Sequence, residues 1–516
     1  MGMVVRLLLL CILPSALSFP AKPKHQKTKL GENTDLFDPI IEANKESGNL
    51  LIYGDVAVPR KRSAQVQCSD CRWPKSRTGI VYIPYKISGS FSLEHAAIMK
   101  TAMEEFATMT CVQFIPQTTE TNCVSIQPLT GCWSYIGKVG GVQTLSLQPG
   151  ACTSYAVIQH ELNHVVGMVH EHSRMDRDNY IIVRRQYISP EHLGSFDTVN
   201  TTSFGMPYDY NSVMHYGNYA FSNTSRQPSM VARMDPNMVL GGADGLNTMD
   251  ITKINRLYNC SSSCGQIHSK WSGNLTSDDY PSQYSNNTSC LYLIRNPVTS
   301  NKIFLSFLAF DVQLTPSCSS DYIKIYDGPS KASPLLAGRT CGSSLPPPVV
   351  SSSRHLLMEF ITDSTVTGSG FQASYESVQC GSVINTVKLN ITSPGYPQDY
   401  PLDVDCVWVI NAPGNLKVRL TIVTLDVEND EKCGYDHLTI YDASSPKVPL
   451  LGPLCGSSVP SAPVTSTSHS MLLAFRSDYS VVRKGFLATY TFVSAPQRLP
   501  ANWRLHAAPN GNSGCL

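Results

Sequence analysis

The strongest constraint on the fold is an internal repeat in the C-terminal half of the chain, in which four cysteines recur about 115 residues later. The two sets are Cys264, Cys290, Cys318 and Cys341, and Cys380, Cys406, Cys433 and Cys455. Both copies are rich in Ser, Pro and Gly, and they contain short alternating segments such as residues 322–326, which is typical of all-β domains. Two copies of this length predict two β domains, residues 264–376 and 380–493, rather than a solenoid.

The composition bounds the domain count and the class of protein. A chain of 516 residues is long enough for about three to four domains. Its 40 Lys and Arg balance 39 Asp and Glu, so the net charge of +1 gives no electrostatic case for binding nucleic acid or an anionic membrane. Hydrophobic residues make up 42%, which excludes a disordered polyampholyte. The 17 cysteines are too many for an ordinary cytosolic enzyme.

Residues 1–18 have the pattern of a secretory signal peptide. Arg6 precedes the apolar run of residues 7–13, which is too short for a membrane span, and Ala16 and Ser18 form a small-x-small cleavage site. A signal anchor is the alternative, and no later stretch predicts a transmembrane segment. We therefore expect a secreted, extracellular protein with disulfides, which could be stored in secretory granules before release. The exported chain offers glycosylation sites at Asn200, Asn223, Asn259, Asn274, Asn286, Asn287 and Asn390.

Two segments flank the predicted folded part of the chain. Residues 19–62 are polar, Lys-rich and free of cysteine, and they end in a basic cluster at residues 59–62. A basic cleavage site after such a leader predicts a pro-segment that is removed after Arg62, whereas a flexible linker with a run of charge is the alternative. At the other end, residues 494–516 predict a flexible tail that carries Cys515.

Residues 63–260 mix helical and strand patterns and predict an α+β domain. Ser92 precedes a helix with one apolar face, formed by Ile98, Ala102, Phe106 and Met109. A second helix is expected to begin near residues 153–154 and to run to residue 166, where Gly167 would form a left-handed C-cap.

The second helix carries the pattern that points to chemistry. His160 and His164 are four residues apart, so both imidazoles project from one helix face and can share a metal ion. Glu161 lies next to whatever the metal binds, and Gly167 allows a turn that brings His170 to the same ion. Three neutral imidazoles with an open position suit a catalytic zinc, and a nearby carboxylate then takes the proton of the acidified water. A helix with incidental histidines is the alternative, but the added spacing of Gly167 and His170 argues against it.

The sequence at this point resembles the astacin family of metzincin peptidases. Residues 170–178 are similar to the family's H-E-x-x-R-x-D-R-D extension, and residues 212–216 to its S-x-M-H-Y turn. The resemblance implies a two-lobed metzincin fold with Met214 as a hydrophobic floor under the zinc histidines. It also implies that Tyr216 is a fifth, displaceable zinc ligand that later stabilises the oxyanion. Taken alone, these two residues would be interpreted as an ordinary core methionine and a half-buried tyrosine.

The resemblance spans roughly residues 50–260. Residues 133–137 and 140–147 match segments of the upper lobe, and the resemblance implies that residues 140–147 form an edge strand that pairs with an extended substrate. It implies the disulfides Cys111–Cys260 and Cys132–Cys152. Cys68 and Cys71 resemble the extra pair of hatching-enzyme-like astacins. The sequence leaves open whether Cys123 and Cys515 pair.

Residues 52–55, Ile-Tyr-Gly-Asp, resemble the F-x-G-D switch of astacin pro-segments. The resemblance implies that Asp55 takes the fourth zinc position and excludes water until the chain is cut after Arg62. The new N-terminus at Ser63 would then be buried towards Glu171, because a buried charge needs a partner. A simple Gly-Asp turn is the alternative for Asp55.

The two β domains resemble CUB domains, which are β-sandwiches that usually bind proteins. The resemblance implies the disulfides Cys264–Cys290, Cys318–Cys341, Cys380–Cys406 and Cys433–Cys455. It also implies that calcium binds in the second copy, between the carboxylates of Glu428, Asp436 and Asp478. The first copy offers one charge fewer, so a weaker site is expected at Gln313, Asp321 and Asp363. Solvated loop residues are the alternative in both copies.

These features predict a zinc metalloendopeptidase that acts on protein substrates, with CUB domains that bind proteins or matrix. With Cys68 and Cys71 the chain looks most like amphibian or avian hatching enzymes, and this resemblance implies that it digests egg-envelope glycoproteins. The lack of an EGF-like cysteine cluster argues against a tolloid-type processor. Another extracellular-matrix or developmental astacin is the alternative enzyme. The alternative of another class is a CUB-mediated adhesion or scaffold protein, against which the complete zinc motif argues.

The cleft shows one departure from the family. Many astacins prefer an acidic residue just after the scissile bond, which is attributed partly to an Arg in an I-G-Q-R segment. The corresponding residues 240–243 are Leu-Gly-Gly-Ala, followed by Asp244, so the Arg is missing and a carboxylate is present. The departure predicts a weaker acidic preference. Arg233 or Arg226 could substitute, and a shortened surface loop is the alternative interpretation.

Overall fold

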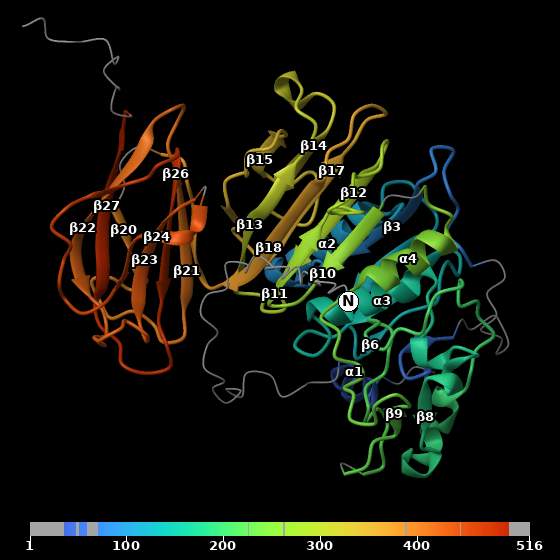
Figure 1. The fold of residues 1–516 in the computed structure, drawn as a ribbon. Helices are drawn as coiled ribbons and strands as arrows, with labels where there is room; N and C mark the ends of the chain where they lie inside the picture. Colours follow the sequence, from blue (N-terminus) through green and yellow to red (C-terminus); the bar gives the residue numbers. More distant parts are fainter. Residues whose placement is uncertain are drawn as a thin grey trace, which may run out of the picture. The chain divides into compact units, whose positions relative to one another are not determined.

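The computed structural model describes residues 36–47, 51–58, 71–224, 226–261, 264–386, 390–443 and 445–494. The signal peptide, the cleavage site after Arg62, Cys68 and Cys515 lie outside these residues. The chain divides into two compact units, residues 1–377 and 378–516, which are described separately (Figure 1). No helix among the described residues is long and apolar enough to cross a membrane.

The first unit begins, after a short N-terminal segment, with an α+β domain built on a five-stranded sheet of order β4-β3-β5-β7-β6. Its strands are β3 (Val81–Ile87), β4 (Val112–Pro116), β5 (Cys123–Gln127), β6 (Cys132–Trp133) and β7 (Val142–Leu147). The strands are parallel except for β6, which runs antiparallel to β7. The prediction that residues 140–147 form the edge is therefore wrong, because β6 covers one end of β7 and takes the outer position.

Two helices of this domain begin where their sequences predict, and the second also ends there. Helix α2 (Leu93–Met109) is capped by Ser92, whose side chain accepts from the N–H of His95, and it buries Ala102, Phe106 and Met109. Helix α3 (Tyr155–Val166) is capped by Ser154. It ends at Gly167, whose φ of 115° lies in the left-handed region and whose N–H reaches two carbonyls of the last turn.

The part of the domain that follows α3 in the chain contains little regular structure. It has the 3-10 turns η1 (Glu171–Ser173), η2 (Arg177–Asn179), η3 (Arg185–Tyr187) and η4 (Pro190–Phe196), the pair β8 (Ile181–Val183) and β9 (Met230–Ala232), and helix α4 (Thr248–Leu257). Disulfides join Cys111 to Cys260 and Cys132 to Cys152. Cys123 is buried as a free thiol among the described residues.

A short N-terminal segment, defined here as residues 36–58 where described, packs against this domain. It contains helix α1 (Phe37–Asn44) and the hairpin strands β1 (Leu51–Ile52) and β2 (Val56–Ala57). Asn44 donates to the carbonyl of Cys132 and accepts from its N–H, at 2.7 and 2.8 Å. The segment is thereby tied to the edge strand β6.

The first β domain completes the first unit as a sandwich of two sheets, β10-β12-β17-β14-β15 and β11-β18-β13-β16. The strands are β10 (Cys264–His268), β11 (Ser272–Thr276), β12 (Ser289–Arg295), β13 (Lys302–Asp311), β14 (Tyr322–Tyr326), β15 (Leu335–Thr340), β16 (Val349–Val350), β17 (His355–Ile361) and β18 (Gly370–Val378), with the turn η5 (Pro316–Cys318). Disulfides join Cys264 to Cys290 and Cys318 to Cys341.

The second unit repeats this topology with the sheets β19-β21-β26-β23-β24 and β20-β27-β22-β25. Its strands are β19 (Cys380–Ile384), β20 (Asn390–Thr392), β21 (Asp405–Asn411), β22 (Lys417–Asp426), β23 (His437–Asp442), β24 (Ser445–Leu454), β25 (Val464–Thr465), β26 (Ser470–Arg476) and β27 (Gly485–Val493). Disulfides join Cys380 to Cys406 and Cys433 to Cys455. The equal strand order confirms that the sequence repeat is a repeat of domains.

Candidate metal centre

Helix α3 presents two imidazoles with fixed orientations. The Nδ1 atom of His160 donates to the carbonyl of Val213 at 2.7 Å, and the Nδ1 atom of His164 donates to the carbonyl of Met168 at 2.8 Å. Each ring therefore keeps the tautomer that leaves a lone pair on Nε2. Such backbone partners are the usual outer contacts of metal-binding histidines.

The turn at Gly167 brings His170 to the same point. Its Nε2 atom lies 3.4 Å from that of His160. A tetrahedral zinc site with bonds of about 2.0–2.1 Å has ligand atoms about 3.3–3.4 Å apart. The spacing of the two imidazole nitrogens thus matches a shared zinc ion.

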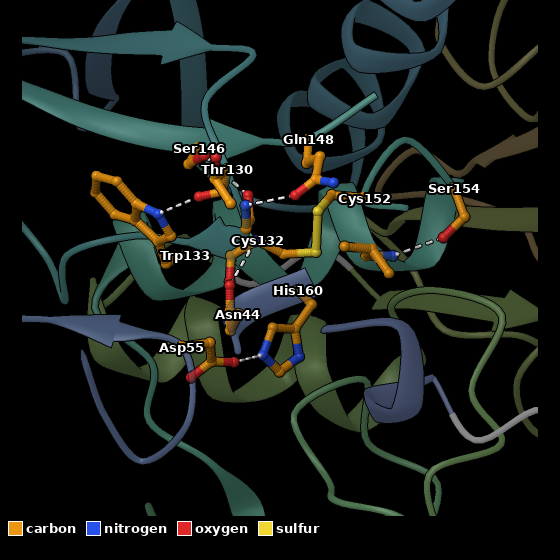
Figure 2. The surroundings of a disulfide bond; sticks show 12 residues. Asn44, Asp55, Thr130, Cys132, Trp133, Ser146, Gln148, Cys152, Ser154 and His160 are labelled. Carbon is orange, nitrogen blue, oxygen red and sulfur yellow. Dashed lines mark hydrogen bonds and ion pairs between the residues drawn. A yellow bond between two sulfur atoms is a disulfide. The ribbon is translucent and has the colours of Figure 1, made fainter. Parts of the chain in front are cut away.

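The carboxylate of Asp55 lies opposite the three histidines. Its Oδ2 atom is 2.8, 3.5 and 3.2 Å from the Nε2 atoms of His160, His164 and His170, in that order. All four side chains are buried, and their ligand atoms lie within 4.8 Å of one another. Figure 2 shows Asp55 facing His160 below the disulfide Cys132–Cys152.

Polar atoms without partners show that the site fits a metal ion. The Nε2 atom of His164 and the Oδ1 atom of Asp55 are buried and lack a hydrogen-bond partner. Both carboxylate oxygens of Glu161 are in the same condition. Native proteins rarely leave buried polar groups unpaired without a functional reason. Three imidazoles and one carboxylate are a donor set suited to zinc.

The protonation states suit metal binding as well. Burial lowers the pKa of His170 to about 4, so this imidazole is neutral at pH 7 and can act as a ligand. Burial, and then the charge of Asp55, raise the pKa of Glu161 well above its ordinary value. A carboxyl group with a raised pKa next to a metal position is suited to taking up and giving back a proton.

The turn at residues 212–216 contacts the histidine cluster through the Val213 carbonyl and the Tyr216 ring. Met214 is buried, and its carbonyl accepts from the N–H of Glu171 at 2.9 Å. Asp250, in the first turn of α4, accepts from the Ser212 hydroxyl at 2.6 Å and from the N–H of Val213 at 3.1 Å. The start of α4 therefore holds the turn whose Val213 carbonyl orients His160.

Tyr216 points towards the N-terminal segment. Its hydroxyl donates to the carbonyl of Tyr53, and its ring lies 3.6 Å from the ring of His172, centroid to centroid. In this state the hydroxyl is held by the N-terminal segment, and Asp55 has the position opposite the histidines.

Phe37 is a residue of the site that the sequence did not single out. Its ring lies 3.9 Å from that of Tyr216 and meets the rings of His160 and His170 edge-on at 5.5 and 5.3 Å. The preceding N–H of Leu36 donates to the carbonyl of Gly241 at 2.9 Å. The available signal was the apolar spacing of Leu36, Phe37, Ile40 and Ile41 within a polar segment.

Glu171 lies in a charged cluster beside the metal position. Lys253 contacts one of its oxygens at 2.8 Å, and Arg174 contacts the other at 2.9 Å. A cavity of about 410 Å³ is lined by both cations, Glu171, Arg256 and Cys71. Lys253 was not found from the sequence, because a lysine in α4 gives no sign that it reaches a residue 82 positions away.

A second group of acids lies in the second β domain. The carboxylates of Glu428, Asp436 and Asp478 converge within 4.8 Å. The Tyr400 hydroxyl donates to Asp436 at 2.7 Å, and the N–H of Asp478 donates to the same carboxylate at 2.7 Å. The first β domain has an equivalent frame, in which Tyr284 donates to Asp321 at 2.6 Å and the N–H of Asp363 donates at 2.7 Å.

Comparisons with known proteins agree with this geometry. The family model for the astacin peptidases matches residues 66–259, and the model for the CUB domain matches residues 264–375 and 380–490. The chain is 43% identical to embryonic protein UVS.2 of Xenopus laevis over 475 residues, which is 92% of this chain and 90% of that protein. It is 42% identical to an astacin-like metalloendopeptidase of Gallus gallus over 392 residues, 71% of this chain and 95% of that protein.

Among solved structures, a match is high choriolytic enzyme 1, a hatching enzyme zinc-protease from Oryzias latipes. It is 41% identical and covers 37% of this chain and 96% of its own, with a TM-score of 0.37. The sequence matches and the histidine cluster together establish the family: the chain belongs to the astacin family of peptidases and is a zinc metalloendopeptidase followed by two CUB domains.

Proposed function

We propose that this peptidase is secreted as a latent precursor and that its active form digests the glycoproteins of an egg envelope. The observation that carries latency is the Asp55 carboxylate, which lies within 3.5 Å of all three zinc histidines. The egg-envelope substrate is supported by the identity of 43% to an embryonic protein over most of both chains. The disulfides of the described domains suit secretion.

Latency in this proposal depends on two contacts of the N-terminal segment. Asp55 fills the position that a substrate carbonyl or a water molecule would need. Phe37 covers the neighbouring surface of Tyr216 and His170 and is fully buried there. The carbonyl of Asp55 also accepts from the N–H of Ser134 at 3.1 Å, so the segment occupies the edge of the sheet.

Activation requires removal of this segment by cleavage after Arg62. The ammonium group of Ser63 would then be drawn towards Glu171, which lies against the cavity described above. Glu171 already pairs with Lys253 and Arg174, so the new N-terminus would share a carboxylate that has two cationic partners. Because Glu171 already has two cationic partners, we expect the terminal ammonium to stabilise the residues around Glu171, and we expect the active site to form without it as well.

In the active form, the chain's own residues would divide the work of peptide hydrolysis. When bound, zinc supplies Lewis-acid chemistry that acidifies water and polarises the scissile carbonyl. Glu161 takes the proton of the attacking water and gives it to the leaving amine. Tyr216, freed from the carbonyl of Tyr53, turns its hydroxyl towards the metal position and donates to the developing oxyanion. The edge at residues 132–134, left by the N-terminal segment, pairs with the extended substrate.

Calcium is proposed as a second metal, held by the second CUB domain. Burial, and then the charges of Asp436 and Asp478, raise the pKa of Glu428, as expected for converging acids that lack a cation. One oxygen of Glu428 is buried without a partner. A hard cation with oxygen ligands would relieve this repulsion. In the first CUB domain Gln313 replaces the glutamate beside Asp321 and Asp363, so binding there should be weaker.

The test of the envelope function is digestion of isolated egg envelopes by the cleaved, zinc-loaded protein. We expect solubilisation of envelope glycoproteins, none with the Glu161→Ala variant, and none in the presence of a zinc chelator. The matched assay replaces the envelope by collagenous matrix. Efficient cleavage of matrix with an intact envelope would reject the hatching function in favour of a matrix-processing astacin.

A further inference from the structure

The first CUB domain packs directly against the catalytic domain. One face of its five-stranded sheet carries Leu291, Leu293 and Leu357, which belong to the same hydrophobic core as the catalytic helices. The backbone of β10 approaches so closely that a Cβ atom on Gly265 would lie 3.2 Å from Met109 and 3.6 Å from Ile251. The two domains therefore share one folded unit.

Arg295, at the end of β12, places a buried positive charge in this contact. Its side chain has no exposed surface, and its guanidinium donates to Glu105 of α2 at 2.6 Å. It also donates to the carboxylate of Asp244 at 3.0 Å and to the carbonyl of Leu246 at 2.9 Å. Removing one partner of a buried ion pair leaves the other charge uncompensated, which costs much more than the loss of an exposed pair.

The bond to Glu105 leads to the zinc helix. The second oxygen of Glu105 accepts from the hydroxyl of Tyr155, the first residue of α3, at 2.7 Å. The same hydroxyl accepts from the amide of Gln159 at 3.3 Å. Gln159, in turn, accepts from the N–H of Leu246 at 2.7 Å and directly precedes His160. Arg295 thus closes a ring of hydrogen bonds around the start of α3.

The bonds to Asp244 and Leu246 connect Arg295 to the segment that contacts Leu36 and to the turn at residues 212–216. On one side, this segment continues from Gly241, whose carbonyl accepts from the N–H of Leu36. On the other side it enters α4 through the capping box of Asn247 and Asp250. Asp250 supports Val213, whose carbonyl orients His160.

The internal repeat shows that the arginine is not a requirement of the β-sandwich. Arg295 faces His355 across the sheet of the first CUB domain, and in the second CUB domain the pair at the same register is Asn411 and Ser470. The fold is the same with an uncharged residue at this position. The arginine complements Glu105 and Asp244 of the catalytic domain instead.

We propose that Arg295 is a positioning residue of the peptidase, supplied by the first CUB domain. It holds the start of helix α3 and the residues 244–246, which precede α4, in the arrangement that catalysis needs. The first CUB domain then helps to position the catalytic residues, in addition to any role in binding proteins.

The test uses the full-length, cleaved and zinc-loaded protein with Arg295→Met, assayed on two peptides that differ only at the first residue after the scissile bond. We expect kcat/KM to fall at least tenfold and the ratio of kcat/KM for the two peptides to change at least threefold. A loss of folded enzyme would lower both rates by one factor and leave the ratio unchanged. Arg476→Met is the matched control, because it removes a buried arginine that lies 3.6 Å from Asp405 within the second CUB domain, and it should change neither quantity.

A second variant keeps the test decisive if Arg295→Met does not fold. Adding Glu105→Gln removes the uncompensated carboxylate, so the double variant should fold and recover part of the lost rate. It still lacks the bonds to Asp244 and Leu246 and should keep the altered peptide ratio. Rates within twofold of the parent together with an unchanged ratio, in either variant, would overturn the proposal.

Discussion

Metal binding and proton transfer are assigned to different residues of the same helix, and substitutions can separate them. Glu161→Ala leaves the three imidazoles in place, so zinc should stay bound while kcat falls by about 10²–10⁴ through loss of the general base. His164→Ala removes a ligand and should lose the metal as well. Zinc content and peptide hydrolysis of the cleaved variants check both. Near-normal turnover by a zinc-loaded Glu161→Ala enzyme would exclude the assigned role.

In the proposed latent state a charged residue and an apolar residue hold the N-terminal segment in place, and the two should contribute independently. In a chain made uncleavable by Arg62→Ala, Asp55→Ala removes the carboxylate from the metal position and should raise hydrolysis of a short peptide at least tenfold. Phe37→Ala removes the ring that lies 3.9 Å from Tyr216 and should give a smaller increase. The double variant should approach the cleaved enzyme. An uncleaved parent that is as active as the cleaved enzyme would contradict the whole scheme.

Among the residues of the site, the sequence predicts those that are brought together by short spacings along the chain. Asp55 lies 105 positions from His160 and could be assigned only through the resemblance of residues 52–55 to a motif of astacin pro-segments. The three histidines and Glu161 could be predicted because helix geometry and one turn bring near neighbours together. Phe37 and Arg295 could not, because each reaches the site through packing between segments more than a hundred residues apart. Neither residue belongs to a pattern whose local spacing implies a shared point in space.

Among the elements, the segment from residue 240 to 246 is the one from which the sequence predicts a weak preference for acidic substrate residues. Asp244 was expected to place a negative charge in the wall, but it lies 3.0 Å from Arg295 and 3.5 Å from Arg354 of the first CUB domain. The two arginines compensate the charge of Asp244, so residues 240–244 present a neutral surface. The carbonyl of Gly241 in this segment accepts from the N–H of Leu36, the residue before Phe37. Apolar side chains suit such a surface better than acidic ones.

Peptides that differ only at the first residue after the scissile bond test this interpretation. We expect a preference for Asp over a neutral residue of less than about threefold. Residues 240–243 lack the Arg that would form a desolvated charge pair, which contributes roughly 1.5–3 kcal/mol. Large apolar residues should be accepted at least as well. A strong Asp preference that survives Arg233→Ala and Arg226→Ala would show that the determinant lies elsewhere.

The contact between strand β17 and helix α3 should make stability depend on pH. His355 is buried against the ring of Tyr155, and burial followed by the charges of Arg354 and Arg295 holds its pKa well below the ordinary 6.5. Below about pH 6.5 the unfolded chain takes up a proton that the folded chain refuses, so the free energy of unfolding should fall by up to about 1.4 kcal/mol per pH unit. The His355→Gln variant should lose this component, as denaturant titrations of both proteins at pH 5 and pH 7.5 would show. Equal losses in the two proteins would contradict it.

The elements themselves could be predicted in type, and the misassigned edge shows where that prediction ends. Helices α2 and α3 begin at capping serines because the cap and the apolar spacing are both local. The order of the strands is not local: two residues of β6, bound to Ser146 and Leu147, take the edge position from β7. A strand this short leaves no periodic signal in the sequence.

At the scale of the whole molecule, two copies of one sandwich belong to different compact units. The first CUB domain shares a core and a buried ion pair with the peptidase, whereas the second is a separate compact unit with its own core. We therefore interpret the first copy as part of the enzyme and the second as the copy available for calcium and for other proteins.

Calorimetry of the full-length protein should resolve this division. We expect one transition for the unit of residues 1–377 and another for the second CUB domain, and calcium should raise only the second by a measurable amount. At 100 times its dissociation constant a ligand stabilises by about 2.7 kcal/mol, which is enough to move the transition of a small domain by several degrees.

Glu428→Gln gives the second copy the residue that the first copy carries at Gln313, and it should abolish the shift because the site loses one of its three carboxylates. The reciprocal Gln313→Glu should create a calcium response in the first transition. A calcium shift that persists in Glu428→Gln, or a parent protein with no shift at all, would show that the three acids are solvated loop residues rather than a cation site. Equal shifts of both transitions in the parent protein would contradict the expected weakness of the first copy.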